Sequence, residues 1–270
     1  MDPLIITAAA VGAELTKEQQ PHLPLTPAEL AADAAACEEA GASIYHLHVR
    51  DPEGRPTMDV ETFRAAHDAI RSHSDVIVQF TSGGAAGDDE ASRLAPLELR
   101  PEMATLTTGT VNFGDEIFSN PAPLVARLYK RMRSLGIMPE FEIFDAGMIE
   151  SAQRVYEDNG GDHHRHYDFV LGVPGGLPAW SDSIAFLAAH LPDGASWTAT
   201  GIGRAHLPVT TETLARGGHV RTGFEDVRYF APGQLADSNR QLIERVVELA
   251  RAGGREVATP PQARQILGLG

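Results

Sequence analysis

The sequence predicts a (β/α)8 barrel, in which a closed parallel sheet is surrounded by helices, and two observations lead to this prediction. Short runs rich in β-branched and aromatic residues alternate with longer helical patterns along the chain. The 270 residues hold eight such strand–helix pairs, the number that a (β/α)8 barrel requires. An open doubly wound sheet is the competing arrangement, but it usually carries a phosphate-binding loop. The stretch TGIGRAH lacks the third glycine of such a loop, and GTVNFG lacks a following Lys-Ser/Thr.

The first strand–helix pair shows how the elements are recognised. An apolar run at residues 4–9 has the composition of a buried strand. In the helix that follows, Thr26 is placed as the N-cap, Pro27 as the first helical residue and Glu29 as the third, which is the pattern of a capping box. We expect this helix to end at Gly41, because glycine readily adopts the backbone conformation of a helix C-terminus.

The other seven pairs follow the same rule, in chain order. Their strands are β-rich apolar runs at residues 43–49, 75–82, 102–108, 138–145, 167–173, 195–202 and 219–226. Their helices have apolar residues at helical spacing and are placed at residues 59–73, 89–96, 121–136, 146–160, 182–191, 210–218 and 238–253. The third helix is short, and a long loop precedes the fourth. No repeat or interdomain linker interrupts the series, so we expect residues 1–270 to form one catalytic domain.

The composition is that of an ordinary globular protein, with 43% hydrophobic and 22% charged residues. The first residues, MDPLIITAAAVGAE, have no basic segment and too short an apolar run for a targeting or membrane segment. Cys37 is the only cysteine, which excludes an intramolecular disulfide and suits a reducing cytoplasm. We therefore expect a cytoplasmic protein.

The formal net charge of -15 argues against nucleic acid and anionic membranes as partners, because both are negatively charged. An anionic metabolite remains compatible with this charge, since a few arginines or a metal ion can reverse the field inside a pocket.

Two histidines lie two residues apart near the end of the second predicted strand, in YHLHVRDPEG. Alternate side chains of a strand face the same way, so His46 and His48 share one face while Tyr45, Leu47 and Val49 share the other. In a barrel the apolar set faces the helices, and the histidines then face the interior near the active-site end. Neutral imidazoles in this place are suitable zinc ligands, although a pair of hydrogen-bonded core histidines is the alternative.

A catalytic zinc site usually has three protein ligands, so a third is expected from another strand end. The eighth predicted strand ends in GGHVRTGFED, and it becomes a neighbour of the first two strands when the barrel closes. Glu225 is therefore the candidate for the third ligand. Glu142 adds a further indication, because its neighbours Phe141 and Ile143 direct it inward, where a carboxylate needs a cation or a metal nearby.

The polar stretch EDNGGDHHRHYD holds three histidines, which by themselves suggest a metal site. It precedes the sixth strand and would lie at the opposite end of the barrel from the active site. We interpret it as a surface loop.

Several motifs together resemble the β-keto acid cleavage enzymes of the 3-keto-5-aminohexanoate cleavage type. They are ITAAAVGAE, LPLTPAEL, GASIYHLHVRDPEGRPT, QFTSGG, MATLTTGTVNFG, FEIFDAG, LGVPGG and GGHVRTGFED, and they run from the first strand to the last. The resemblance implies a zinc-dependent (β/α)8 barrel, usually a homotetramer. It also implies an activity that converts a β-keto acid and acetyl-CoA into acetoacetate and a new acyl-CoA.

The resemblance carries over to particular residues. It implies that His46, His48 and Glu225 bind zinc and that Asp226 removes the substrate proton while Arg221 orients it. It further implies substrate contacts or positions near the metal for other residues, which are Glu14, Ser82 and Gly83 of TSGG, Thr107, Asn112 and Glu142.

This assignment makes chemical sense, because zinc can polarise a carbonyl and so make the C2 proton of a β-keto acid easier to remove. The resulting carbanion would attack the thioester, and a retro-Claisen step would release acetoacetate. Each residue also has a structural alternative. Arg221 and Asp226 can form an ion pair that closes the barrel, Glu14 and Ser82 can stabilise turns, and Arg204 can be a solvated loop residue or a phosphate contact.

The sequence departs from the family in one place that bears on the substrate. Val227 stands where the family commonly has asparagine, and the stretch RYFAPGQLADSN that follows is unusual for it. This leaves the side chain of the β-keto acid open.

Three other functions compete with this interpretation. A zinc hydrolase of the amidohydrolase type would need further inward histidines on the fifth and sixth strands, and MPEFEIFD and YDFVLGV contain none. A metal-dependent lyase or aldolase would cleave a carbon–carbon bond without CoA. A noncatalytic barrel would bind a small acid through zinc and would not need Asp226.

Overall fold

The computed structural model of this protein describes residues 1–85 and 87–269. Eight strands form a closed barrel in the order β1-β12-β11-β10-β9-β6-β5-β2. They are β1 (Ile6–Ala9), β2 (Ile44–Leu47), β5 (Ile77–Phe80), β6 (Met103–Thr107), β9 (Met138–Ile143), β10 (His166–Leu171), β11 (Ser196–Gly201) and β12 (His219–Thr222). All neighbouring strands of the barrel are parallel. The predicted (β/α)8 barrel is confirmed, and the open sheet is excluded.

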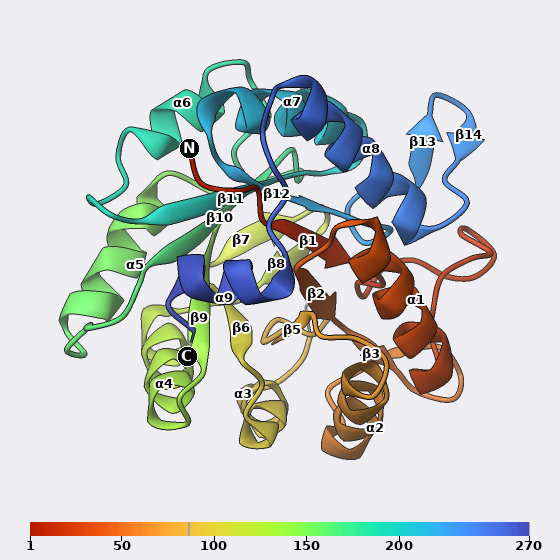
Figure 1. Cartoon of the computed structure of the whole chain (residues 1–270). Coiled ribbons are helices and arrows are strands. Elements are labelled where there is room, and N and C mark those ends of the chain that lie inside the picture. Colours follow the sequence, from red (N-terminus) through yellow and green to blue (C-terminus); the bar gives the residue numbers. More distant parts are fainter. Residues whose placement is uncertain (86, 270) are drawn as a thin grey trace.

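Helices surround the barrel and separate its strands along the chain, as Figure 1 shows. They are α1 (Pro27–Ala40), α2 (Val60–Arg71), α3 (Glu90–Leu94) continued by η1 (Ala95–Leu99), α4 (Ala122–Ser134), α5 (Gly147–Glu157), α6 (Ser183–Ala188), α7 (His206–Arg216) and α8 (Asn239–Ala252). The predicted capping box is present at Thr26 and Glu29, and Gly41 ends α1 in the left-handed conformation. Local sequence signals therefore fix where α1 begins and ends.

Helix α7 begins at His206, four residues before the predicted start at Thr210. The His206 side chain is buried, and its Nε2 lies 2.6 Å from Thr222 Oγ1 of β12. This tertiary contact extends the helix over a segment whose composition alone does not indicate a helix.

A ninth helix, α9 (Pro260–Leu267), was not predicted and crosses the barrel in the centre of Figure 1. It packs on side chains from the amino ends of the strands. Together they form a second core cluster, separate from the main core between the sheet and the helices, which consists of Ile5, Ile44, Ile77, Met103, Met138, Ala258, Ala263 and Leu267. Because these residues are apolar and fully or almost fully buried, α9 closes the end of the barrel opposite the active site.

The barrel strands alternate as expected, with large side chains toward the helices and smaller or polar ones toward the interior. Tyr45, Phe141 and Tyr167 are fully buried between the sheet and the helices. Polar side chains fill the middle of the barrel, among them Gln79, Glu140 and Asp168, which have 1% exposure or less.

His166 corrects the interpretation of the histidine-rich stretch as a surface loop. It is the first residue of β10 and is fully buried, with Nδ1 2.7 Å from Ser196 Oγ and Nε2 3.2 Å from Glu140 Oε2. His163 and His164 precede the strand and are partly buried. The strand begins earlier than predicted because both ring nitrogens of His166 find hydrogen-bond partners inside the barrel, Ser196 Oγ and Thr198 Oγ1.

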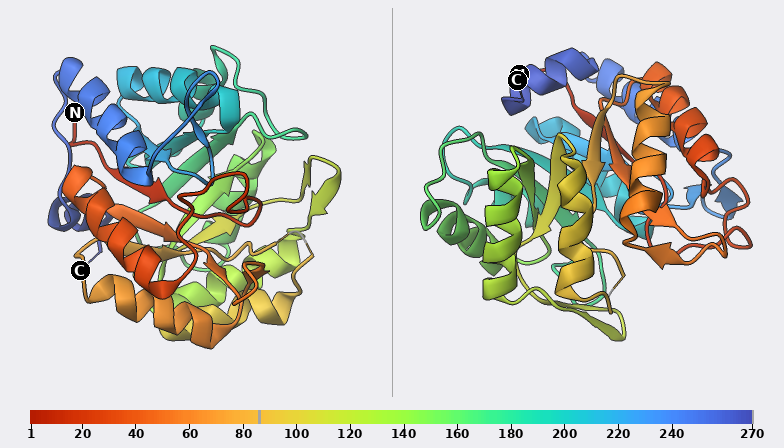
Figure 2. Two further views of the ribbon diagram at one scale, coloured as in Figure 1. Left: turned by 90° about the vertical axis from the view of Figure 1, so that its right-hand side faces the viewer. Right: turned by 90° about the horizontal axis from the view of Figure 1, so that it is seen from below.

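Three hairpins follow strands of the barrel. They are β3 (Val49–Arg50) with β4 (Pro56–Thr57), β7 (Val111–Phe113) with β8 (Glu116–Phe118), and β13 (Tyr229–Ala231) with β14 (Gln234–Leu235). The β7–β8 hairpin projects beyond the barrel in the views of Figure 2. Across residues 1–85 and 87–269, each helix is too short or too polar to cross a membrane.

Candidate metal centre and active site

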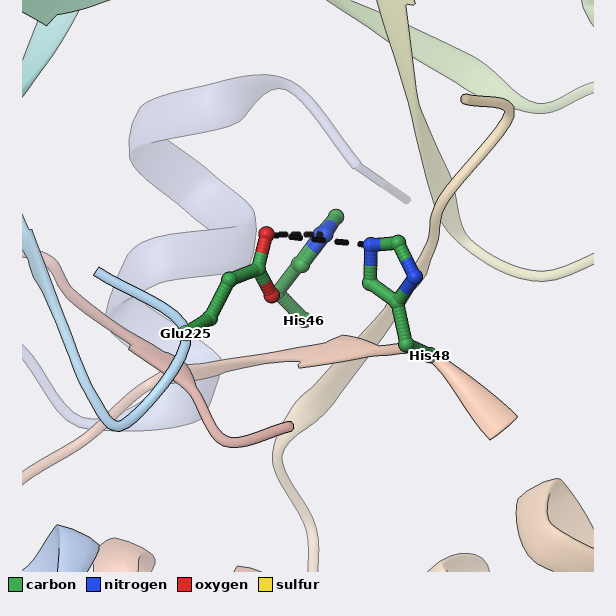
Figure 3. Close-up of side chains that lie close together, drawn as sticks. All are labelled: His46, His48 and Glu225. Atoms are coloured by element: carbon green, nitrogen blue, oxygen red, sulfur yellow. Dashed lines mark ion pairs between the residues drawn. The ribbon is translucent and has the colours of Figure 1, made fainter. Parts of the chain in front are cut away.

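His46, His48 and Glu225 converge at the carboxyl ends of neighbouring strands. His46 belongs to β2, His48 follows it directly, and Glu225 lies three residues after β12. Strand β1 pairs with both β2 and β12, so the three side chains come from one side of the barrel. Figure 3 shows the carboxylate of Glu225 facing both imidazoles.

The three side chains have the geometry of a metal site. One carboxylate oxygen, Glu225 Oε1, lies 3.6 Å from His46 Nε2 and 3.7 Å from His48 Nε2. One ligand atom from each residue can be chosen so that all lie within 4.8 Å of one another. A tetrahedral zinc ion with bonds of about 2.0–2.1 Å keeps its ligand atoms roughly 3.3–3.5 Å apart. The observed spacing fits a divalent ion with small side-chain movements.

The protonation states of the three residues also suit a cation. Burial lowers the pKa of His46 to about 3 and lowers that of His48, so both imidazoles are neutral at neutral pH and have a free lone pair. Burial by itself raises the pKa of Glu225, but Arg221 and the two histidines outweigh it and lower the pKa to about 2. The other oxygen, Glu225 Oε2, is buried without a hydrogen-bond partner. A negative charge and an unsatisfied oxygen are what a metal ion would compensate.

Arg221 joins this group to a second carboxylate. Its Nε donates to Asp226 Oδ2 at 3.1 Å and its Nη2 to Asp226 Oδ1 at 3.0 Å, while Nη2 also donates to Glu225 Oε1. A third acid, Glu142, lies with Oε1 3.8 Å from Nη1 of Arg221. Thr107 Oγ1 donates to the other Glu142 oxygen at 2.5 Å. One buried guanidinium therefore donates hydrogen bonds to two carboxylates and lies within ion-pair distance of a third.

Two of the acids around Arg221 have a raised pKa because of burial. Burial raises the pKa of Asp226 to about 6, even though Arg221 opposes it. Burial raises the pKa of Glu142 to about 7, again against the effect of Arg221. Desolvation is the larger effect, so Asp226 holds its proton more tightly than an ordinary aspartate.

The loop that carries Glu225 is fixed by close backbone contacts. A Cβ on Gly223 would lie 2.0 Å from the carbonyl oxygen of Ala9, and a Cβ on Gly12 would lie 2.7 Å from Glu225 Cγ. The Glu225 amide donates to Ala9 O at 3.1 Å. Only glycine at positions 12 and 223 permits this approach, so both glycines help to place the carboxylate.

Asn239 holds the same loop from the side of α8. Its Oδ1 accepts from the Phe224 amide at 2.8 Å, and its Nδ2 donates to Ala10 O at 3.2 Å and to Asp33 Oδ2 at 3.0 Å. Asn239 is fully buried. It connects the residue before Glu225 to the end of β1 and to α1.

A cavity of about 920 Å³ opens at this end of the barrel. The predicted residues that line it are Glu14, His46, His48, Gly83, Glu142, Arg221, Glu225 and Asp226. Beyond the polar centre its walls are largely apolar, with Phe113, Phe118, Phe144, Val173 and Phe224 among them. Val227, which departs from the family pattern, is also part of the wall. The volume is that of an ordinary small-molecule site.

Three residues predicted to contact substrate do not line this cavity. Ser82 is buried, and its Oγ donates to the carbonyl oxygen of Thr105 at 2.6 Å. Thr107 reaches the site only through its hydrogen bond to Glu142. Asn112 is exposed on the β7–β8 hairpin. Sequence position alone could not show that the hydroxyl of Ser82 donates to a backbone carbonyl and that of Thr107 to a neighbouring acid.

Sequence reasoning missed Gln79, whose Oε1 lies 2.8 Å from His46 Nδ1 and accepts its proton when Nε2 is the free nitrogen. A signal was available, because Gln79 is the one polar residue inside the apolar run IVQF. It lies two residues from both Ile77 and Thr81 along the strand, so its side chain faces the barrel interior as theirs do. Asn239 had no such signal, since its partners Asp33 and Ala10 are more than 200 positions away in the chain.

Comparison with known proteins assigns the family. The chain matches the family model described as beta-keto acid cleavage enzyme over residues 3–269. It is 48% identical over 271 residues to the 3-keto-5-aminohexanoate cleavage enzyme of Fusobacterium nucleatum subsp. nucleatum, covering 100% of this chain and 99% of the relative. It is 38% identical over 272 residues to the 3-oxoadipate:acetyl-CoA acetyltransferase of Cupriavidus necator, covering 99% and 95%.

A solved structure supports the fold independently. The apo structure of ObcA superimposes with a TM-score of 0.80 at 19% sequence identity, covering 93% of this chain and 66% of ObcA. At this identity the likeness concerns the barrel alone. Together with the whole-length matches, these findings show that the chain belongs to the β-keto acid cleavage enzyme family, whose members break carbon–carbon bonds.

Proposed function

We propose that this protein is a zinc-dependent enzyme that converts a β-keto acid and acetyl-CoA into acetoacetate and a new acyl-CoA. The observation that carries the proposal is that the His46–His48–Glu225 group and the Arg221–Asp226 pair lie in one cavity. Membership of the β-keto acid cleavage enzyme family and the names of relatives that use acetyl-CoA point to the same reaction.

His46, His48 and Glu225 would hold the metal ion. Two imidazoles and one carboxylate form a typical donor set of catalytic zinc, which leaves a coordination position free for substrate. When bound, a zinc ion supplies Lewis-acid polarisation of a substrate carbonyl. Gln79 orients His46 through the hydrogen bond to its Nδ1.

Asp226 is the proposed general base, and it removes a proton from C2 of the β-keto acid. Both of its oxygens are held by Arg221, so the carboxylate keeps one orientation in the cavity. Glu142 Oε1 lies 3.8 Å from Nη1 of Arg221, and Glu142 is proposed to position this guanidinium. Gly83 and Glu14 line the cavity and are the proposed substrate contacts. Ser82, Thr107 and Asn112 remain proposed substrate residues, and in the free protein the hydroxyls of Ser82 and Thr107 donate to Thr105 O and to Glu142.

The bonds then change in a balanced sequence. The C2 carbanion attacks the carbonyl carbon of acetyl-CoA, and the CoA thiolate leaves. The thiolate attacks the original ketone carbon, and the bond between this carbon and C2 breaks. The ketone fragment leaves as a new acyl-CoA, and the C2 fragment takes a proton back from Asp226 to become acetoacetate. No covalent bond to the enzyme is formed.

The experiment that tests this proposal is incubation of the purified, zinc-loaded protein with acetyl-CoA and a panel of β-keto acids. We expect at least one acid to yield equal amounts of acetoacetate and a new CoA thioester. Omission of acetyl-CoA should stop the reaction, which distinguishes this enzyme from a lyase without CoA. If no acid gives both products, the proposal is refuted.

The metal assignment has its own test. His46→Ala or His48→Ala should abolish both zinc content, measured by mass spectrometry of the metal, and acetoacetate formation. His73→Ala is the matched control, because His73 is an exposed histidine just after α2. Full zinc occupancy in either of the first two variants would refute the ligand set.

We further propose that residues 1–270 act as one catalytic domain of a cytoplasmic homotetramer, as the resemblance to the family implies. Exposed apolar side chains support self-association, among them Trp180 at 63% and Phe186 at 49% exposure. Light scattering coupled to size exclusion measures the assembly directly, and a monomeric mass would contradict it.

A further inference from the structure

Among residues 1–85 and 87–269, three arginines that line the cavity have no carboxylate partner. Of the four arginines that line the cavity, Arg221 is paired with Glu225 and Asp226. No ion pair within residues 1–85 and 87–269 includes the other three, which are Arg204, Arg228 and Arg245 and which we call the arginine rim. The chain has 37 acidic and 22 basic residues, so unpaired cations gathered at one place are unexpected.

Two residues of the arginine rim are held in place by the β13–β14 hairpin. Arg228 Cζ lies 5.0 Å from the ring centroid of Tyr229, and Arg245 Cζ lies 4.7 Å from that of Phe230. Arg245 Nη1 also donates to the carbonyl oxygen of Phe230. The aromatic rings orient the guanidinium groups and leave their charge uncompensated.

Arg245 is partly buried and has no acid beside it in the described part of the chain. It reaches from α8, and its Nε is buried without a hydrogen-bond partner. Its Nη2 lies 3.3 Å from Nδ1 of His206, a residue that is neutral because burial lowers its pKa to about 3. Burial also lowers the pKa of Arg245, since no acid offsets the loss of water. An anion bound here would supply the negative charge that no acidic residue of the described chain provides to Arg245.

Arg204, the third residue of the arginine rim, belongs to a different element from Arg228 and Arg245. It lies in η2 (Gly203–Ala205), directly after β11, and is exposed. The carbonyl oxygen of Asp226 accepts from the Gly203 amide at 2.7 Å, which ties this turn to the loop of the metal centre. The rim and the reacting centre therefore belong to one connected site.

We propose that Arg204, Arg228 and Arg245 bind the phosphate groups of the CoA co-substrate, an inference that rests on the proposed function. Guanidinium groups match phosphate oxygens through paired hydrogen bonds. Tyr229 lies beside Arg228, is 41% exposed and offers a ring on which the adenine base can stack. With phosphates at the rim, the thioester end of CoA extends into the same cavity toward His46, His48 and Glu225.

The anion that the arginines bind could also come from the β-keto acid, if its side chain ends in a carboxylate. The two sources differ in which substrate depends on the arginines. For CoA, the arginines affect the binding of the nucleotide whatever the acid is. For an acidic side chain, they affect the KM of that acid and leave acetyl-CoA binding as it is.

The test uses 3′-phospho-ADP, the nucleotide part of CoA, as a probe of binding by calorimetry to the zinc-loaded protein. Arg204→Ala, Arg228→Ala and Arg245→Lys should each weaken its binding about tenfold, the loss expected for one charge-assisted contact. The preference of the enzyme for acetyl-CoA over acetyl-pantetheine, which lacks the nucleotide, should fall by about the same factor. Arg251→Ala, an exposed arginine of the same helix, is the control.

Each outcome decides between the possibilities. Unchanged binding of 3′-phospho-ADP in all three variants refutes the arginine rim, and so does a rise in KM confined to β-keto acids with a second carboxylate. Arg204 and Arg228 are at least partly exposed, so their variants keep the test valid if Arg245→Lys unfolds. Binding through the rim without any acetoacetate formation refutes the proposed function and leaves the phosphate site standing.

Discussion

The guanidinium of Arg221 binds both oxygens of Asp226, with Nε 3.1 Å from Oδ2 and Nη2 3.0 Å from Oδ1. Both residues are almost fully buried, at 4% exposure each. The paired geometry is one that arginine forms and lysine cannot. Because the same Nη2 also donates to Glu225, the proposed base and a proposed metal ligand share one cation.

Asp226→Asn should lower kcat without loss of metal. Asparagine has nearly the same size but cannot accept the C2 proton, so we expect kcat to fall by about 10²–10⁴. Zinc content and acetoacetate formation are measured on the same sample, with Asp237→Asn, an exposed aspartate, as control. Retention of kcat by the Asp226 variant would assign the base to another residue or support a noncatalytic barrel.

Gln79→Leu should weaken metal binding while both histidines remain. The variant removes the partner of His46 Nδ1, and loss of such an orienting contact typically costs 10–100-fold in affinity, so we expect a loss of about that size. Competition with a chelator measures the dissociation constant for zinc. Gln153→Ala, on a partly exposed position of α5, should keep the wild-type value. Equal affinities of the two variants would show that Gln79 has no orienting role.

Asn239→Ala should affect both stability and metal affinity. It leaves the buried Phe224 amide without an acceptor, which costs about 1–3 kcal/mol in the free energy of unfolding. The loop of Glu225 is then less fixed, so the zinc dissociation constant should rise. Asn159→Ala, which removes an amide donor at the end of α5, serves as control for stability alone. A destabilised protein with unchanged zinc affinity would limit Asn239 to a structural role.

Asp33 should make stability depend on pH. Burial raises its pKa to about 6, although Tyr45 and Asn239 partly oppose this through hydrogen bonds. The folded protein thus binds this proton more tightly than the unfolded chain, whose aspartates titrate near 3.9. The contribution of Asp33 to stability is therefore complete below about pH 4 and is lost as pH rises through about 6.

The Asp33→Asn variant lacks this titration. Its free energy of unfolding relative to wild type should rise between pH 4 and pH 7 by an amount on the order of 3 kcal/mol. Denaturant titrations of both proteins without zinc measure it at each pH. Burial also raises the pKa of Cys37 and Tyr45, so these neighbours stay neutral over the range. A difference between the two proteins that is constant with pH would contradict the prediction.

Leu267→Ala should destabilise the barrel from its closed end. Leu267 is 1% exposed and packs with Ile44 and Met103 in the second core cluster. Truncation of a buried leucine costs about 2–5 kcal/mol in the free energy of unfolding. Gln265→Ala on the exposed face of α9 should change it by less than about 0.5 kcal/mol. Equal stability of the two variants would mean that α9 is not required for the barrel.

The sequence by itself determined the barrel and the faces of its strands. Each strand and helix is recognised from neighbours within a few residues, as at Thr26 and Glu29, and the period of two directs His46 and His48 to one face. These signals are local, so they need no knowledge of the rest of the fold. The roles of the site residues in catalysis remain predictions.

Only the tertiary structure decided which distant groups meet. It brought Gln79 to His46 and Asn239 to Phe224, placed His166 beside Glu140, and directed Ser82 to a strand carbonyl. It also placed α9 against the amino ends of the barrel strands, although the local sequence of α9 does not indicate what the helix packs on. The physical reason is that burial forces each polar group to find whichever partner the closed barrel brings within hydrogen-bonding distance, and closure joins residues that are far apart in the chain.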